Sequence, residues 1–185
     1  ITVNPIGQVD AIDSQILCNA DETAAIAFST ENTGGTTTYA WVNDTPSIGL
    51  ASSGNGDIDS FNVVNNGNEP VTATVVVTPS FEGCTGPEET FTITVNPTAE
   101  MNDPENMVVC NAEVTDAVEF TTDNTGGTTT YTWTNDTPAI GLAATGSGDL
   151  PSFTAINTGT EPIVATVVVT PLFTDDINCD GISQT

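Results

Sequence analysis

Short runs rich in Val, Ile, Thr and aromatic residues alternate along the chain with clusters of Gly, Asn, Asp and Pro. This pattern is typical of β-strands joined by tight turns, because Gly and Asn tolerate a positive φ. No amphipathic helical period is present, although one helical turn is expected around residues 46–50. In the first half of the chain the expected strands are residues 12–18, 24–30, 36–42, 59–65, 71–79 and 89–96.

Two of these runs show which side chains enter the core. Residues 36–42 alternate between polar and larger side chains, so alternate residues share one face of the strand. Residues 71–78 alternate at first and then become continuously apolar, as in a strand at the centre of a sheet. The expected core residues on the first run and on its counterpart in the second half are Tyr39, Trp41, Tyr131 and Trp133. For the two tryptophans, stacking on a ligand is the alternative role.

The first half of the sequence returns in the second half. Residues 32–39 repeat as residues 124–131, and residues 73–79 repeat as residues 165–171, both at an offset of 92. The offset becomes 95 after Phe173, because the second copy has three extra residues there. A period of this length is too long for a solenoid unit and fits an independently folded β-sandwich. The chain is therefore expected to be all-β, with two tandem immunoglobulin-like β-sandwich domains.

The repeat also sets the expected domain limits. Residues 93–97, the expected last strand of the first repeat, have the same sequence as the first five residues of the chain. Residues 1–7 are therefore expected to be the last strand of a preceding repeat or a donor strand. Residues 8–97 are expected to form the first repeat, and residues 98–185 a second repeat that lacks its own last strand. The residues expected to take part in strand complementation are Ile1, Thr2, Val3, Asn4 and Pro5.

A β-sandwich without one edge strand exposes unpaired backbone groups and part of its core, which favours pairing with another chain. We expect residues 1–5 of a neighbouring copy to fill the gap in residues 98–185. The contact is head to tail and does not close, so it predicts a filament. The sequence leaves open whether successive units are joined covalently or by donor-strand exchange.

Each repeat has two cysteines at matching positions. A zinc site is not expected, because the chain has neither a CxxC spacing nor a histidine. Pairing within each repeat, Cys18 with Cys84 and Cys110 with Cys179, is the simplest arrangement, since the copies are equivalent. Such bonds imply an oxidising, extracellular compartment. Buried free thiols are the alternative.

The charge of the chain excludes several classes of function. The chain has 25 acidic residues and no Lys, Arg or His, which gives a formal net charge of -25. Neutralising nucleic-acid phosphates or an anionic membrane surface needs basic residues. Without histidine there is no ordinary general base near neutral pH. The carboxylate pair Asp57 and Asp59 is not kept in the second repeat, where Pro151 replaces Asp59. We therefore expect no enzymatic activity and no catalytic residues.

Calcium needs only oxygen ligands, so an acidic protein can bind it without histidine. The candidate cluster is Asp175, Asp176 and Asp180, although its spacing is not that of an EF-hand loop. A solvated acidic loop is the alternative. No other cofactor is expected.

Several motifs recur in the same order in both repeats. Tyr-x-Trp-x-Asn-Asp-Thr-Pro-x-Ile-Gly-Leu begins at Tyr39 and at Tyr131, and Gly-x-Gly-Asp-x-x-Ser-Phe and Val-Val-Val-Thr-Pro follow. Together with Cys-x-Gly and Thr-Ile-Thr-Val-Asn-Pro, these motifs resemble the PKD-like repeats of giant surface adhesins in Bacteroidetes, including gliding-motility adhesins. The resemblance covers the whole chain. The Trp-Asp-Phe-Gly-Asp-Gly string of PKD domains is absent, because Val-Asn-Asp or Thr-Asn-Asp follows Trp here.

The resemblance implies a β-sandwich that is exported to the cell surface, commonly by type IX secretion, and that serves in a stalk or filament. The expected function is therefore a rigid, acidic spacer of an adhesin or extracellular filament, whose partners are other copies of itself. The alternative is a carbohydrate- or ligand-binding module of a secreted multidomain protein. Such a module should show a row of exposed aromatic side chains. The residues that could form one are Phe61, Phe81, Phe153 and Phe173.

Overall fold

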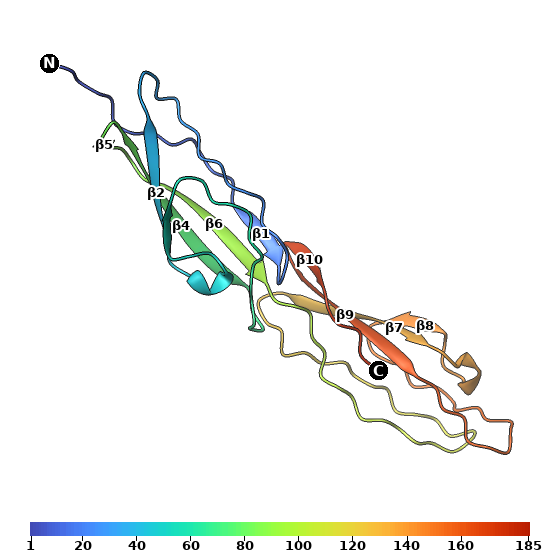
Figure 1. Ribbon diagram of the computed structural model, residues 1–185. Helices are drawn as coiled ribbons and strands as arrows, with labels where there is room; N and C mark the ends of the chain where they lie inside the picture. The colour runs from blue at the N-terminus through green and yellow to red at the C-terminus, as the bar shows by residue number, and fades with distance from the viewer. The chain divides into compact units, whose positions relative to one another are not determined.

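The computed structural model describes all 185 residues, which divide into two units, Ile1–Pro97 and Thr98–Thr185. Each unit is built of β-strands and one short 3-10 helix, η1 (Pro46–Ile48) in unit 1 and η2 (Pro138–Ile140) in unit 2 (Figure 1). The division falls after Pro97, where the first repeat is expected to end. No helix has the length and apolar character needed to cross a bilayer.

Unit 1 contains one main sheet, in which the strand order is β1-β6-β4-β2-β3 and β5 pairs with β4. All pairs are antiparallel except β1 with β6, which run parallel. The strands of unit 1 are β1 (Gln15–Cys18), β2 (Thr37–Asn43), β3 (Ser53–Asn55), β4 (Val71–Phe81), β5 (Cys84–Thr85) and β6 (Glu89–Asn96).

The layer opposite this sheet is less regular than expected. The expected strands 24–30 and 59–65 are not regular strands. In this part of the unit the pairing consists of the isolated bridges Ile26 with Ile58 and Glu22 with Asn62. Side chains take backbone donors that a regular ladder would use. The Phe28 N–H donates to the Asp57 carboxylate at 2.9 Å, and the Phe61 N–H donates to the Thr23 hydroxyl at 3.1 Å. Such local bonds compete with regular pairing and leave an extended, irregular layer.

The core of unit 1 lies between these two layers. Trp41 is 7% exposed, in keeping with its expected place in the core, and its Nε1–H donates to the carbonyl of Gly56 at 3.2 Å. Tyr39, on the same face of β2, is half-buried and packs against this core. The buried residues of the central strands β4 and β6 are Ala73, Val75, Val77, Phe91, Ile93 and Val95.

Unit 2 repeats part of this arrangement. Its sheet has the order β10-β9-β7-β8, and it has no counterparts of β1 and β6. Trp133 is 4% exposed, and Tyr131 is also buried. The strands are β7 (Thr128–Asn135), β8 (Thr145–Ser147), β9 (Val167–Asp175) and β10 (Ile177–Asp180). The buried core residues are Met101, Phe120, Tyr131, Trp133, Leu142, Leu150 and Val169.

Neither β3 nor β8 is expected from the sequence. Their sequences, Ser-Gly-Asn and Thr-Gly-Ser, have low strand propensity. The glycine is needed because the ring of Trp41 lies directly against Gly54, its cross-strand partner, and Trp133 lies in the same way against Gly146. The helical turn expected at residues 46–50 is present as η1, which ends at Gly49 with φ +102°.

Cys18 and Cys84 lie at opposite ends of the unit 1 sheet. Because β1 runs parallel to β6, Cys18 lies beside Asn96, the last residue of β6. Cys84 pairs with Phe81 at the far end of β4, an eleven-residue strand. These ends are roughly 35 Å apart at about 3.3 Å per residue. A disulfide requires Cα atoms within about 7 Å.

The expected disulfides Cys18–Cys84 and Cys110–Cys179 are therefore wrong. Cys84 and Cys110 have free thiols, whereas Cys18 and Cys179 are disulfide-bonded. Equal numbers of cysteines in the two repeats favour pairing within each repeat. The sequence does not indicate that β1 runs parallel to β6, and this parallel direction places Cys18 far from Cys84.

Candidate functional site

Unit 2 has an open strand position beside β9. In unit 1 the corresponding position holds β6, which pairs with β4 on one side and with β1 on the other. In unit 2 only Gln184 reaches it, exchanging two backbone hydrogen bonds with Val169 at 2.8 and 2.9 Å. From Val168 back to residue 163, no strand pairs with this side of the sheet. The backbone groups along this edge are therefore available to another strand.

The two sides of this open position expose apolar side chains. Val108, in the segment equivalent to β1, is 98% exposed, whereas its unit 1 counterpart Ile16 is 40% exposed. On the other side Val164 is 80% exposed. Val167 is partly exposed, whereas its counterpart Val75, which pairs with Phe91 of β6, is fully buried. The apolar residues at the open position are Met107, Val108, Val109, Ile163 and Val164.

A side-chain amide marks the end of the open position. In unit 1 the Asn65 Nδ2 group donates to the carbonyls of Glu69 and Val95, both at 2.8 Å. It therefore links the turn before β4 to β6. Its counterpart Asn157 donates to the Glu161 carbonyl at 2.9 Å. The amide hydrogen that Asn65 gives to β6 has no acceptor at Asn157.

The first residues of the chain have the character of an unpaired strand. Residues 1–5 form no β-pairs, and Ile1 and Val3 are 124% and 87% exposed. Their sequence is that of residues 93–97, which begin within β6. Ile6 and Gly7 belong instead to unit 1. The Asn32 side chain donates to the Ile6 carbonyl at 3.2 Å, and the Gly7 N–H donates to the Cys84 carbonyl at 2.9 Å.

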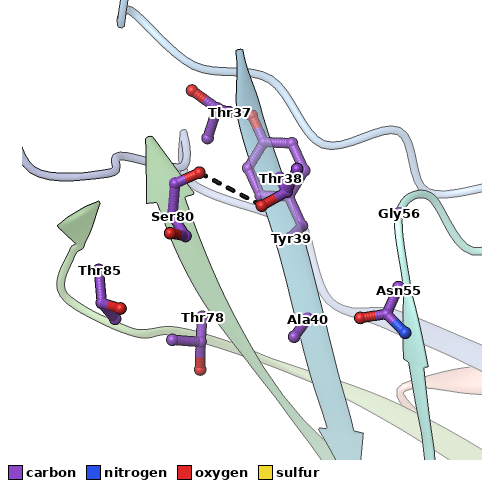
Figure 2. Close-up of a pocket in the computed structure, with 9 residues that line it drawn as sticks. All are labelled: Thr37, Thr38, Tyr39, Ala40, Asn55, Gly56, Thr78, Ser80 and Thr85. Carbon is purple, nitrogen blue, oxygen red and sulfur yellow. Dashed lines mark hydrogen bonds between the residues drawn. The ribbon is translucent and has the colours of Figure 1, made fainter. Parts of the chain in front are cut away.

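A second candidate site is an open hollow of about 570 Å³ on the outer face of the unit 1 sheet (Figure 2). Six of its nine lining residues carry a hydroxyl group, and Thr38 donates to the Ser80 carbonyl at 3.3 Å across it. The repeat does not preserve this lining, since Leu172 replaces Ser80 and Asp180 replaces Thr85. The lining residues are Thr37, Thr38, Tyr39, Ala40, Asn55, Gly56, Thr78, Ser80 and Thr85.

No row of exposed aromatic side chains is present. Phe81 and Phe173 are buried, and Phe61 and Phe153 are partly buried against the cores. Tyr39 contacts Phe28, with ring centroids 5.3 Å apart. Burial raises the pKa of Tyr39 above its ordinary value. The aromatic residues therefore stabilise the cores and offer no stacking platform.

The acidic residues do not converge on a metal site. Asp175, Asp176 and Asp180 do not form a cluster that could hold a metal ion, and no such cluster exists elsewhere. The candidate calcium site is therefore not formed. Asp57 has a structural role, since it accepts the Phe28 N–H at 2.9 Å, and Asp149 accepts the Phe120 N–H at 3.0 Å in the second repeat.

No family model matches the chain, and no curated protein matches it. Among solved structures it is similar to a crystal structure of DIP-gamma IG1+IG2, with a TM-score of 0.56 and 9% identity over 98% of this chain and 96% of that chain. A second match is SGBP-B of the Bacteroides ovatus mixed-linkage glucan utilization locus, in complex with a mixed-linkage heptasaccharide. Its TM-score is 0.33 and its identity 13%, over 97% of this chain and 47% of that chain. The first similarity shows the fold, and the chain is an all-β protein of immunoglobulin-like β-sandwich type.

Proposed function

We propose that the chain is a structural repeat of a secreted surface adhesin or extracellular filament, in which copies assemble head to tail by strand complementation. The observation that carries this proposal is the open strand position beside β9. Residues 1–5 of a second copy take this position. They have the sequence of the segment that fills the equivalent position in unit 1, and they are unpaired in their own chain.

The register follows from the pairs that β6 makes in unit 1. The incoming segment runs antiparallel to the start of β9 and parallel to the segment around Val108. The antiparallel pairs are Ile1 with Ala165, Thr2 with Val164 and Val3 with Ile163. The parallel pairs are Ile1 with Met107, Thr2 with Val108, Val3 with Val109 and Asn4 with Cys110.

Burial of apolar surface drives the docking. Ile1 and Val3 are fully exposed in the free chain, and burying such a side chain contributes about 1.5–3 kcal/mol. The exposed residues on both sides of the open position gain burial in the same step. Backbone hydrogen bonds to both neighbouring segments fix the direction of the strand, as in other cases of β-augmentation.

Other features support an extracellular spacer without catalytic activity. Disulfide-bonded cysteines are typical of oxidising compartments. The absence of His and Lys removes the most common general acid–base side chain and the usual amine base. The carbohydrate-binding alternative has no specific observation in its favour, because the aromatic residues are buried or partly buried and form no exposed row. The lining of the unit 1 hollow is also not preserved in unit 2. A structural module that is repeated to lengthen the protein agrees better with these observations than a carbohydrate-binding module does.

The test is the assembly state of the 185-residue chain, measured by sedimentation velocity and negative-stain electron microscopy. We expect concentration-dependent filaments. Val3→Asp should prevent them, because it places a charge in the apolar strand position. The matched control is Val42→Asp, which adds the same charge at an exposed position on the outer face of β2.

A competing peptide gives a second measurement on the unaltered chain. A peptide with the sequence of residues 91–97 should occupy the open position and shorten the filaments, and a scrambled peptide should not. Wild-type chain that remains monomeric at high concentration, or filaments that form equally well with Val3→Asp, would contradict the proposal.

A further inference from the structure

The four cysteines fall into two structural types. Cys18 and Cys110 are equivalent, and each lies in the same turn. The Cys18 N–H donates to Asp21 at 3.0 Å, and the Cys110 N–H donates to Glu113 at 2.9 Å. These are the turn cysteines. The two hairpin cysteines are Cys84, which pairs with Phe81, and Cys179, which pairs with the equivalent Phe173.

Each type has one bonded and one free member. Cys18 and Cys179 are disulfide-bonded, and Cys110 and Cys84 are free. The two turn cysteines each donate their N–H to an acidic side chain three residues farther along. The two hairpin cysteines pair with equivalent phenylalanines, although the unit 2 hairpin is three residues longer. The free thiols therefore occupy positions that form disulfides in the other repeat, and the two types cannot pair within one unit because they lie at its opposite ends.

Strand complementation brings the two free thiols together between copies. In the register given above, Cys110 of one copy lies beside Asn4 of the next. Only three residues farther along, Gly7 donates its N–H to the Cys84 carbonyl at 2.9 Å. Three residues span at most about 10 Å. Cys84 of the incoming copy therefore lies at the same junction as Cys110 of the receiving copy.

We propose that Cys110 of one copy and Cys84 of the next form an intermolecular disulfide that locks the head-to-tail contact, an inference that rests on the proposed function. The two thiols lose two protons and two electrons as the S–S bond forms. A low-molecular-weight disulfide accepts them by thiol–disulfide exchange, and its own S–S bond is reduced to two thiols. Cys110 is exposed and Cys84 is half-buried, so both can be reached by an oxidant before docking.

The bond has a clear physical role. Each copy carries a formal charge of -25, and no basic side chain exists to form ion pairs across the contact. Apolar burial and backbone hydrogen bonds must therefore hold copies together against charge repulsion. A disulfide makes the junction independent of concentration and ionic strength once it has formed.

The experiment treats the assembled chain with oxidised glutathione and analyses it on a non-reducing denaturing gel. We expect a ladder of covalent multimers that collapses on reduction. Cys84→Ser alone and Cys110→Ser alone should each run as monomers while still forming filaments under the microscope. A mixture of the two variants should give a covalent dimer and nothing larger, because each variant retains one half of the bond.

Peptide mapping identifies the bond directly. Trypsin does not cut a chain without Lys and Arg, but cleavage after Glu should release residues 83–88 linked to residues 106–113. Filaments without a ladder, or covalent dimers of either variant alone, would overturn the disulfide and leave the assembly intact. Absence of filaments in every sample would overturn the proposed function itself.

Discussion

The Oδ1 atom of Asp44 accepts a hydrogen bond from the backbone N–H of Thr74 at 2.8 Å, and Asp136 accepts the equivalent bond from Thr166 at 2.8 Å. The hydroxyl of Thr45 donates to the same oxygen of Asp44 at 2.8 Å. The bond from Thr74 is the main cause that lowers the pKa of Asp44, because it favours the charged form. The Asn-Asp-Thr-Pro motif thus joins the end of β2 to β4.

This bond predicts a pH-dependent loss of stability. The folded-state pKa of Asp44 lies below its unfolded value of about 3.9, so the contribution is complete above that pH and is lost as pH falls through the folded-state value. Asp44→Asn should lower the urea midpoint at pH 7, and its difference from wild type should shrink below about pH 3.9. Asp59→Asn changes the net charge equally and serves as the control. A difference that stays constant with pH would contradict this prediction.

The contact between Gly54 and Trp41 predicts a steric effect. A Cβ atom at Gly54 would overlap the indole ring, and overpacking of this kind costs about 1–3 kcal/mol. Gly54→Ala should therefore lower the unfolding free energy of unit 1 by about that amount, measured by the fluorescence of Trp41 in urea. Gly67→Ala is the matched control, since only the Asn65 side chain at 3.4 Å approaches that position. Equal effects of the two substitutions would refute the packing explanation.

Much of the strand framework could be predicted from sequence because the repeat and the alternation of side chains report directly on it. Tyr39 and Trp41 alternate in phase with the buried face of β2, and the apolar run after Val71 forms the central strand β4. These features depend on local periodicity. They do not depend on which strands become neighbours.

The features that could not be predicted depend on contacts distant in sequence. The free thiol of Cys84 results from the parallel direction of β1, and direction leaves no mark in composition. The strand β3 exists because a glycine fits against Trp41, although its sequence suggests a turn. The side-chain bond from Phe28 to Asp57 interrupts a ladder that propensity alone would extend.

The free amide hydrogen of Asn157 predicts a specific contact in the assembly. By equivalence with Asn65, which donates to Val95, Asn157 should donate to the Val3 carbonyl of the incoming copy. Asn157→Asp removes the donor but keeps an oxygen for the N–H of Gly159, which bonds the amide oxygen at 2.9 Å. One hydrogen bond contributes about 0.5–1.5 kcal/mol.

Binding of the peptide with the sequence of residues 91–97 should therefore weaken about two- to twelvefold in Asn157→Asp, as measured by isothermal titration calorimetry. Asn65→Asp is the control, because unit 1 already holds its own β6. That variant should lose stability and keep its affinity for the peptide. Unchanged affinity in Asn157→Asp would show that the amide does not contact the strand.

Charge predicts an unusual response of the assembly to salt. Each copy has a formal charge of -25 and no basic side chain, so copies repel one another and no side-chain ion pair can form between them. The Debye length falls from about 30 Å at 0.01 M to about 3 Å at 1 M ionic strength. Non-covalent assembly of the Cys110→Ser variant should therefore strengthen as sodium chloride rises, whereas an interface built on ion pairs would weaken.

Calcium and magnesium at equal ionic strength should act alike, because the acidic residues form no metal cluster. Sedimentation velocity checks both statements, and a strong preference for calcium would instead indicate a metal site at the junction between copies.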